Sequence, residues 1–252
     1  MENRFGIGSV LGTGFKIWFK NLLPFMLITS LIYIPVLIWG IATVQGEPEL
    51  VGYVKSLETF TRASIMIVPL SNIFVSAALT YGVVMELQGQ HASIGSCIAT
   101  GLSRFFPVLG VAFLTALAVA GGTLLLIVPG IIIFCMLYVA TQASVLERPG
   151  IMGALRRSRE LTDGHKMEIF GLLFLLGLMN FGATKIIETI MVDPTTITPE
   201  NVYGVIRKYM YVDLARAVIV GSIGAVMAAV AYFQLRNEKE GTSASELARV
   251  FE

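Results

Sequence analysis

Long apolar stretches separated by short polar segments dominate the hydrophobic pattern of the chain. A helix that rises 1.5 Å per residue needs about 20 mostly apolar residues to cross a hydrocarbon core of about 30 Å. Six stretches meet this requirement, at approximately residues 22–43, 63–87, 105–127, 129–146, 167–190 and 212–234. The pattern therefore predicts an all-α integral membrane protein with six transmembrane helices.

The third and fourth stretches are separated only by a short segment containing Pro129 and Gly130. Proline followed by glycine is typical of a turn and predicts a tight helical hairpin. A single long helix kinked at Pro129 is the alternative. The uninterrupted run from Phe105 to Leu146 covers 42 residues, about twice one bilayer crossing, which favours the hairpin.

A second pattern, with helical periodicity, precedes the first, third and fifth stretches. Apolar or small residues recur at offsets 0, 3, 4 and 7, continuing to 8 and 11 in the first two copies, as is typical of one-faced helices. The copies are Ile7, Val10, Leu11, Gly14, Phe15 and Trp18; Ile94, Cys97, Ile98, Gly101, Leu102 and Phe105; and, more weakly, Ile151, Ala154, Leu155 and Ser158.

This recurrence predicts three repeats of an amphipathic cytoplasmic helix followed by a helical hairpin. The repeats cover about residues 7–90, 94–147 and 151–236 of a single membrane domain, and 237–252 form a short cytoplasmic tail. The amphipathic helices either lie in the headgroup layer or are short buried helices that redirect the chain. Both alternatives fit the pattern.

Basic residues are distributed unequally between the two sides of this topology. Of the 18 Lys and Arg, twelve fall in the terminal segments and in residues 88–104 and 147–166, and six fall on the opposite side. The positive-inside rule therefore places both termini in the cytoplasm. On the opposite side, Thr198–Glu200 predicts the start of a helix that leads into the sixth stretch.

The composition supports the membrane assignment and excludes several other classes. Hydrophobic residues make up 55% of the chain and charged residues 14%, and the net charge is +1. This excludes a disordered chain and argues against nucleic-acid binding, which needs a dense excess of basic residues. Cys97 and Cys135 fall in an amphipathic helix and in a membrane stretch, so no disulfide is expected.

Residues 128–132, 145–150 and 153–162, with the sequences VPGII, VLERPG and GALRRSRELT, carry a resemblance to a known family. They resemble the membrane-domain family found fused to some glycerophosphodiester phosphodiesterases and in related stand-alone inner-membrane proteins of bacteria. The match is clearest over residues 128–170. The resemblance implies a multi-span helical fold in the bacterial inner membrane and no assigned chemistry, and the chain contains no soluble phosphodiesterase domain.

The residues offer little for catalysis or metal binding. His91 and His165 are the only histidines, they lie in different loops, and neither has the spacing of a metal site. No ionisable residue lies at the middle of a membrane stretch, which argues against an ion-coupled transporter. We therefore expect no enzyme activity, no metal and no cofactor.

The deepest polar residues in the membrane stretches are Asn72, Gln142 and Asn180. Uncharged amides ordinarily form hydrogen bonds between helices, although these three could line a substrate path if they converged. Small residues at four-residue spacing also mark two helix-packing seams, for which contact within the chain is the default expectation. They are Ala112, Ala116 and Ala120, and Gly221, Ala225 and Ala229.

The most charged segment, residues 147–168, offers a candidate site for lipid headgroups. Its candidate ligands are Arg156, Arg157, Arg159 and Lys166. Four acidic residues in the same segment favour the alternative, in which the bases fix topology and form local ion pairs such as Arg156–Glu160.

Taken together, these features predict a non-enzymatic inner-membrane protein that acts as an accessory or scaffold subunit of a membrane complex or in membrane organisation. Its expected partners are the lipid bilayer and a membrane protein or a second copy of the chain. The alternative is a transporter or lipid-handling protein with a cavity between the hairpins.

Overall fold

The computed structural model describes residues 5–44, 50–191 and 202–250. These residues form nine helices and no strand. The helices are α1 (Ile7–Lys20), α2 (Leu22–Val44), α3 (Leu50–Leu87), α4 (Ile94–Leu125), α5 (Ile127–Met136), α6 (Ala140–Leu146), α7 (Gly150–Thr162), α8 (Lys166–Met191) and α9 (Val202–Val250). Six segments are long and apolar enough to cross a membrane. The fold is therefore that of an all-helical, multi-pass membrane protein.

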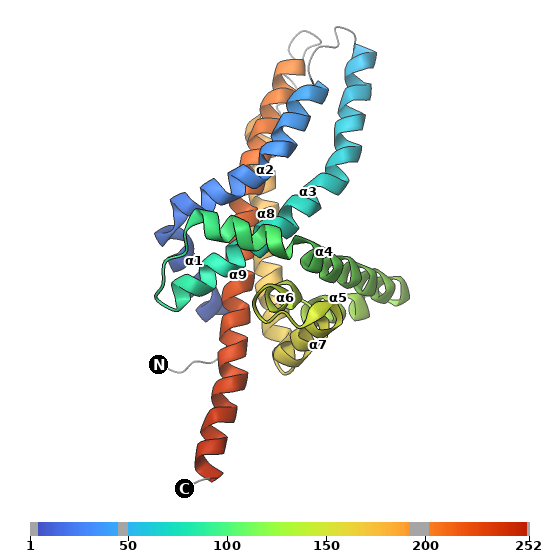
Figure 1. The fold of residues 1–252 in the computed structure, drawn as a ribbon. Coiled ribbons are helices and arrows are strands. Elements are labelled where there is room, and N and C mark those ends of the chain that lie inside the picture. The colour runs from blue at the N-terminus through green and yellow to red at the C-terminus, as the bar shows by residue number, and fades with distance from the viewer. Residues whose placement is uncertain (1–4, 45–49, 192–201, 251–252) are drawn as a thin grey trace.

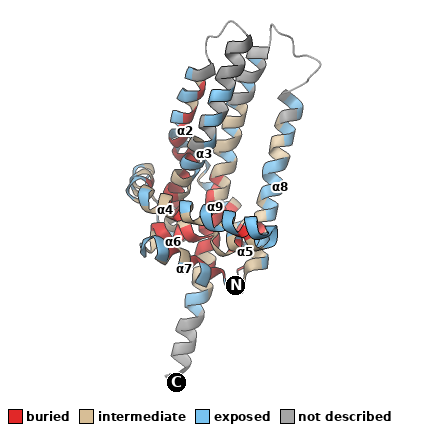
Figure 2. Ribbon diagram, turned by 90° about the vertical axis from the view of Figure 1, so that its right-hand side faces the viewer, coloured by how far each residue is buried: buried red, intermediate tan, exposed pale blue. Residues whose placement is uncertain are grey.

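Four long helices, α2, α3, α8 and α9, run along the long axis of the molecule, and both chain ends lie at the same end of them (Figure 1). Buried residues gather around α2, α3, α6 and α9, whereas α8 is mostly exposed (Figure 2). Tyr33, Leu79, Met227 and Tyr232 are among the largest fully buried side chains. We call α2, α3 and α9 the bundle, since these three helices carry most of the core.

The hairpin of α4 and α5, which we call the arm, is oriented differently. In both views α4 runs across the direction of the long helices and carries the hairpin away from them (Figures 1 and 2). Pro107 lies inside α4, and an internal proline permits a bend because it removes one helical hydrogen bond. The tip of the arm, Leu124–Val128, is 64–89% exposed at every residue.

The sequence pattern predicts the turn of this hairpin at Pro129 and Gly130, but the structure places it three residues earlier. The helix breaks at Leu126, which has an extended backbone with φ −163° and ψ 150°. Pro129 lies in the first turn of α5, where its missing N–H is not needed. Gly130 serves close packing instead, because a Cβ there would lie 3.0 Å from the Cα of Thr123.

The predicted helix boundaries differ from the observed ones in three further places. The third stretch forms a single helix, α4, together with the amphipathic helix predicted before it. The fourth is divided into α5 and α6 by Leu137–Val139. Helices α3 and α9 extend well beyond their apolar segments, because polar residues with helical propensity continue them outside the apolar window. The predicted helix start at Thr198–Glu200 lies outside the described residues.

The small residue at offset 7 of each predicted amphipathic helix lies at a helix contact. A side chain at Gly14 would overlap Met227 of α9, and a Cβ at Gly101 would lie 2.7 Å from the Phe74 ring of α3. The hydroxyl of Ser158 donates a 2.9 Å hydrogen bond to the carbonyl of Met136 at the end of α5. Each of these short helical segments therefore packs against a membrane helix from a different part of the chain.

Candidate functional site

A cluster of ionic and hydrogen-bonded side chains joins α6, α7 and α9 near the end of the molecule that carries the termini. Arg157 of α7 donates from Nε to both oxygens of Glu147, at 2.9 and 3.0 Å. The Tyr232 hydroxyl of α9 donates to Glu147 at 2.6 Å. Arg157 also pairs with Glu240, which accepts a 2.9 Å hydrogen bond from Arg236. The cluster therefore fixes three helices to one another.

The charges within this cluster balance, with two arginines facing two glutamates. The side chains of Glu147 and Arg157 are only 20% and 23% exposed. Burial lowers the pKa of Arg157, but the hydrogen bonds and charges of Glu147 and Glu240 outweigh it and raise this pKa above its ordinary value. Since each arginine has a carboxylate partner, the cluster has no excess positive charge with which to hold an anion.

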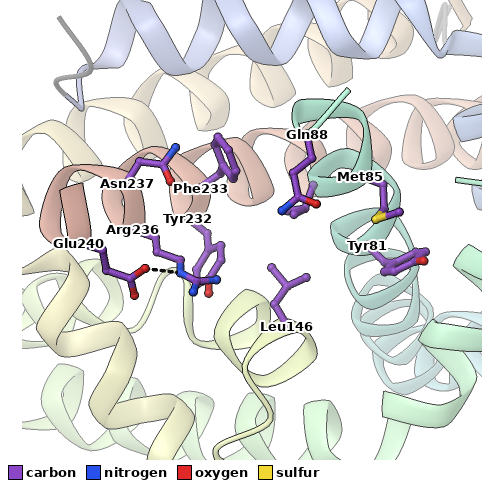
Figure 3. Close-up of a pocket in the computed structure, with 10 residues that line it drawn as sticks. Tyr81, Met85, Gln88, Leu146, Tyr232, Phe233, Arg236, Asn237 and Glu240 are labelled. Atoms are coloured by element: carbon purple, nitrogen blue, oxygen red, sulfur yellow. Dashed lines mark hydrogen bonds and ion pairs between the residues drawn. The ribbon is translucent and has the colours of Figure 1, made fainter. Parts of the chain in front are cut away.

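A cavity of about 390 Å³ lies beside the cluster, between the end of α3, the end of α6 and α9. Figure 3 shows the paired Arg236 and Glu240 on one side and Tyr81 and Met85 on the other, with Leu146 between them. Gln88 adds a carboxamide to the wall. These groups can form hydrogen bonds with a small polar molecule, but the lining contains no histidine or cysteine that would act as a base or nucleophile.

The three amides predicted as candidate intramembrane site residues have separate partners. Asn72 of α3 accepts a 2.8 Å hydrogen bond from Tyr33 of α2, and Gln142 of α6 donates a 3.3 Å bond to Ser76 of α3. Asn180 of α8 accepts a 2.6 Å bond from Arg216 of α9. Each amide therefore links two helices, and none of the three lines the cavity beside the cluster.

Three of the four basic residues predicted as headgroup ligands form ion pairs. Arg156 lies 3.4 Å from Glu160, which confirms the predicted local pair. Arg157 belongs to the cluster, and Lys166 lies 3.0 Å from Asp163. The hydrogen bond and charge of Lys166 hold the pKa of Asp163 below its ordinary value. Arg159 is exposed, and the structure does not bring the four bases together on one acceptor.

A second hollow, of about 600 Å³, lies within the arm, and none of the three amides lines it either. One wall is the small-residue stripe of α4, Ala112, Ala116 and Ala120, and the other includes Phe134 and Leu137. The prediction that this stripe packs inside the chain is wrong for Ala116 and Ala120, which are exposed on the groove.

The two histidines contact glutamates, and the two cysteines are buried. His91 lies 3.1 Å from Glu86, and His165 lies 3.4 Å from Glu238. Glu238 also accepts a 2.6 Å hydrogen bond from the backbone N–H of Phe5. Cys97 and Cys135 are free and buried. Within residues 5–44, 50–191 and 202–250, no group of three or more His, Cys, Asp or Glu side chains has a geometry suited to a metal ion.

Sequence reasoning missed Tyr232, Arg236 and Glu240 as members of the cluster. These residues recur every four positions on α9, which places them on one helical face, but nothing in the pattern indicates that this face meets Glu147.

Comparison with known proteins identifies no relative. The chain matches no family model, no curated protein and no solved structure.

Proposed function

We propose that this protein is a non-enzymatic, multi-pass protein of the bacterial inner membrane, with both termini in the cytoplasm. It acts as an accessory or scaffold subunit of a membrane complex or in membrane organisation. The observation that carries the proposal is the unfilled small-residue groove of the arm. Such a stripe permits close approach of another transmembrane helix, and the described part of the chain supplies none to cover Ala116 and Ala120.

The contacts of the amphipathic helices support the three-repeat organisation. In terms of the predicted repeats, α1 of the first repeat packs on α9 of the third. The start of α4 in the second packs on α3 of the first, and α7 of the third packs on α5 of the second. This order is cyclic, as expected of three units arranged around one axis, although the hairpin of the second unit is oriented differently. The twelve-to-six distribution of basic residues supports the orientation.

The separate partners of Asn72, Gln142 and Asn180 favour the accessory function over transport. A substrate path through the membrane needs polar groups that face a shared cavity. In this protein each amide has a hydrogen bond to a neighbouring helix. The lipid-handling alternative retains one supporting observation, which is the size of the groove in the arm.

Site-specific photo-crosslinking in native membranes tests this function. A photoreactive amino acid at Ala116 should give one discrete protein adduct, and the same group at Phe174, which is 62% exposed on α8, serves as the control. Ala120→Leu, which fills the groove, should abolish the adduct. A lipid adduct alone from position 116 would instead support the lipid-handling alternative. Equal labelling from both positions would contradict both functions.

A further inference from the structure

The arm has features of a hairpin that enters the membrane and turns back before reaching the other side. Residues 105–146 contain no Asp, Glu, Lys, Arg or His. A segment of 42 residues without charge, exposed on its outer faces, needs a hydrocarbon environment. At the same time, α4 lies across the direction of the long helices instead of alongside them (Figures 1 and 2).

The length of the returning helix is the second observation. Helix α5 has 10 residues, so it spans about 15 Å, which is half of a hydrocarbon core of about 30 Å. The chain then leaves the helix at Leu137–Val139 and continues in α6, where Gln142, Ala143 and Ser144 are buried in protein. The lipid-exposed part of the return is therefore long enough for one leaflet only.

The third observation is the chemistry of the tip. A hairpin that crosses the membrane places its turn at the opposite headgroups, where polar and aromatic anchors are enriched. Leu124–Val128 instead presents five aliphatic side chains in succession, each more than 60% exposed.

At the helix break in the tip, both backbone polar groups of Leu126 have hydrogen-bond partners. Leu126 donates its N–H to the Gly122 carbonyl at 3.1 Å and accepts from the Gly130 N–H at 3.4 Å. Pro129 has no N–H that would need a partner.

We propose that the arm is a re-entrant hairpin, whose tip Leu124–Val128 is anchored in the hydrocarbon of the leaflet nearest the two termini. The long helices α2, α3, α8 and α9 then cross the bilayer, while the arm occupies one leaflet. Because the hairpin enters and leaves on the same side, its two flanking loops stay on that side. Counts of basic residues therefore cannot distinguish it from two full crossings. The proposal holds whether or not the groove binds a partner.

Labelling of single cysteines from each side of sealed membrane vesicles tests this placement. The test uses full-length protein in which Cys97 and Cys135 are replaced by alanine, with a membrane-impermeant maleimide as the probe. Leu126→Cys should react from neither side. Gln90→Cys should react only from the side of the termini, and Ile190→Cys, near the end of α8, only from the opposite side. Reaction of Leu126→Cys from either side would overturn the proposal.

Fluorescence quenching gives a second measurement that keeps both native cysteines. Leu126→Trp is introduced after Trp18 and Trp39 have been replaced by phenylalanine, and the protein is placed in vesicles of phosphatidylcholine brominated at defined acyl positions. We expect the strongest quenching from bromines within the acyl chains and little from aqueous iodide. Quenching by iodide added on the side opposite the termini would show a full crossing.

Discussion

The bundle and the arm carry the same sequence pattern and use it differently. In α9, the stripe of Gly221, Ala225 and Ala229 is packed inside the protein, with Ala225 and Ala229 only 6% and 0% exposed. In α4, Ala116 and Ala120 lie exposed on a groove of about 600 Å³. Small residues permit close approach of helices but do not determine which helix approaches. Whether a neighbour is present depends on how the long helices are arranged, which the stripe itself does not specify.

The largest difference between these regions should appear when each stripe is filled. Ala229→Leu overpacks a fully buried site and should destabilise the protein by about 3 kcal/mol. The matched change Ala116→Leu enters open space and should change stability by less than about 0.5 kcal/mol. The midpoint of SDS-induced unfolding from mild detergent measures both. Equal destabilisation would mean that the groove at Ala116 is filled in the folded protein.

Much of the bundle could be predicted from the sequence because apolar length alone identifies membrane helices. The same criterion could not describe the arm. It treats 129–146 as one helix, but the chain bends at Leu137–Val139 so that α6 can reach the interior between α3 and α7. The ionic cluster depends on this bend as well, since Glu147 follows α6 directly. Its partners on α9 lie 85 or more residues away in sequence, so no local pattern indicates the contact.

The cluster joins the end of α6, which follows the arm, to α7 and α9, and removing its central acid should loosen these contacts. Glu147→Ala leaves Arg157 and Tyr232 without their shared acceptor and should destabilise the protein by about 2 kcal/mol. Glu160→Ala removes only the exposed pair with Arg156 and should lose less than about 0.5 kcal/mol. Hydrogen exchange should show increased exchange at α6 and α7 in the first variant only. Unchanged protection of α7 would mean that the cluster does not join these helices.

The hydroxyls of two tyrosines allow a finer comparison of hydrogen bonding in the two regions. The Tyr33 hydroxyl of the bundle bonds to Asn72, whereas the Tyr138 hydroxyl next to the arm is buried and has no partner within the described part of the chain. Tyr33→Phe should therefore lose about 0.6 kcal/mol. Tyr138→Phe should gain about 1 kcal/mol, because it removes a buried polar group that is unsatisfied. The same SDS titration gives both signs, and a loss for Tyr138→Phe would show that its hydroxyl has a partner in the membrane.

Small effects of opposite sign are expected at the loop that leads from α6 into α7. Arg148 has φ 58°, in the left-handed region, and Gly150 has φ 77°. This conformation costs an L-residue about 1–2 kcal/mol, a cost that glycine does not have. Glycine is in turn destabilised by about 0.5–1 kcal/mol because it loses more conformational freedom on folding. Arg148→Gly should therefore stabilise the protein by about 0.5 kcal/mol.

The reverse substitution in the same loop provides the matched control. Nothing lies within 4 Å of a Cβ built on Gly150, so Gly150→Ala introduces backbone strain without a steric clash. It should destabilise the protein by about 1 kcal/mol. Opposite shifts of the unfolding midpoint for the two variants would show that this turn, which connects Glu147 at the end of α6 to α7, stores local backbone strain. Shifts of the same sign would mean that the Arg148 side chain makes a contact that outweighs its backbone conformation.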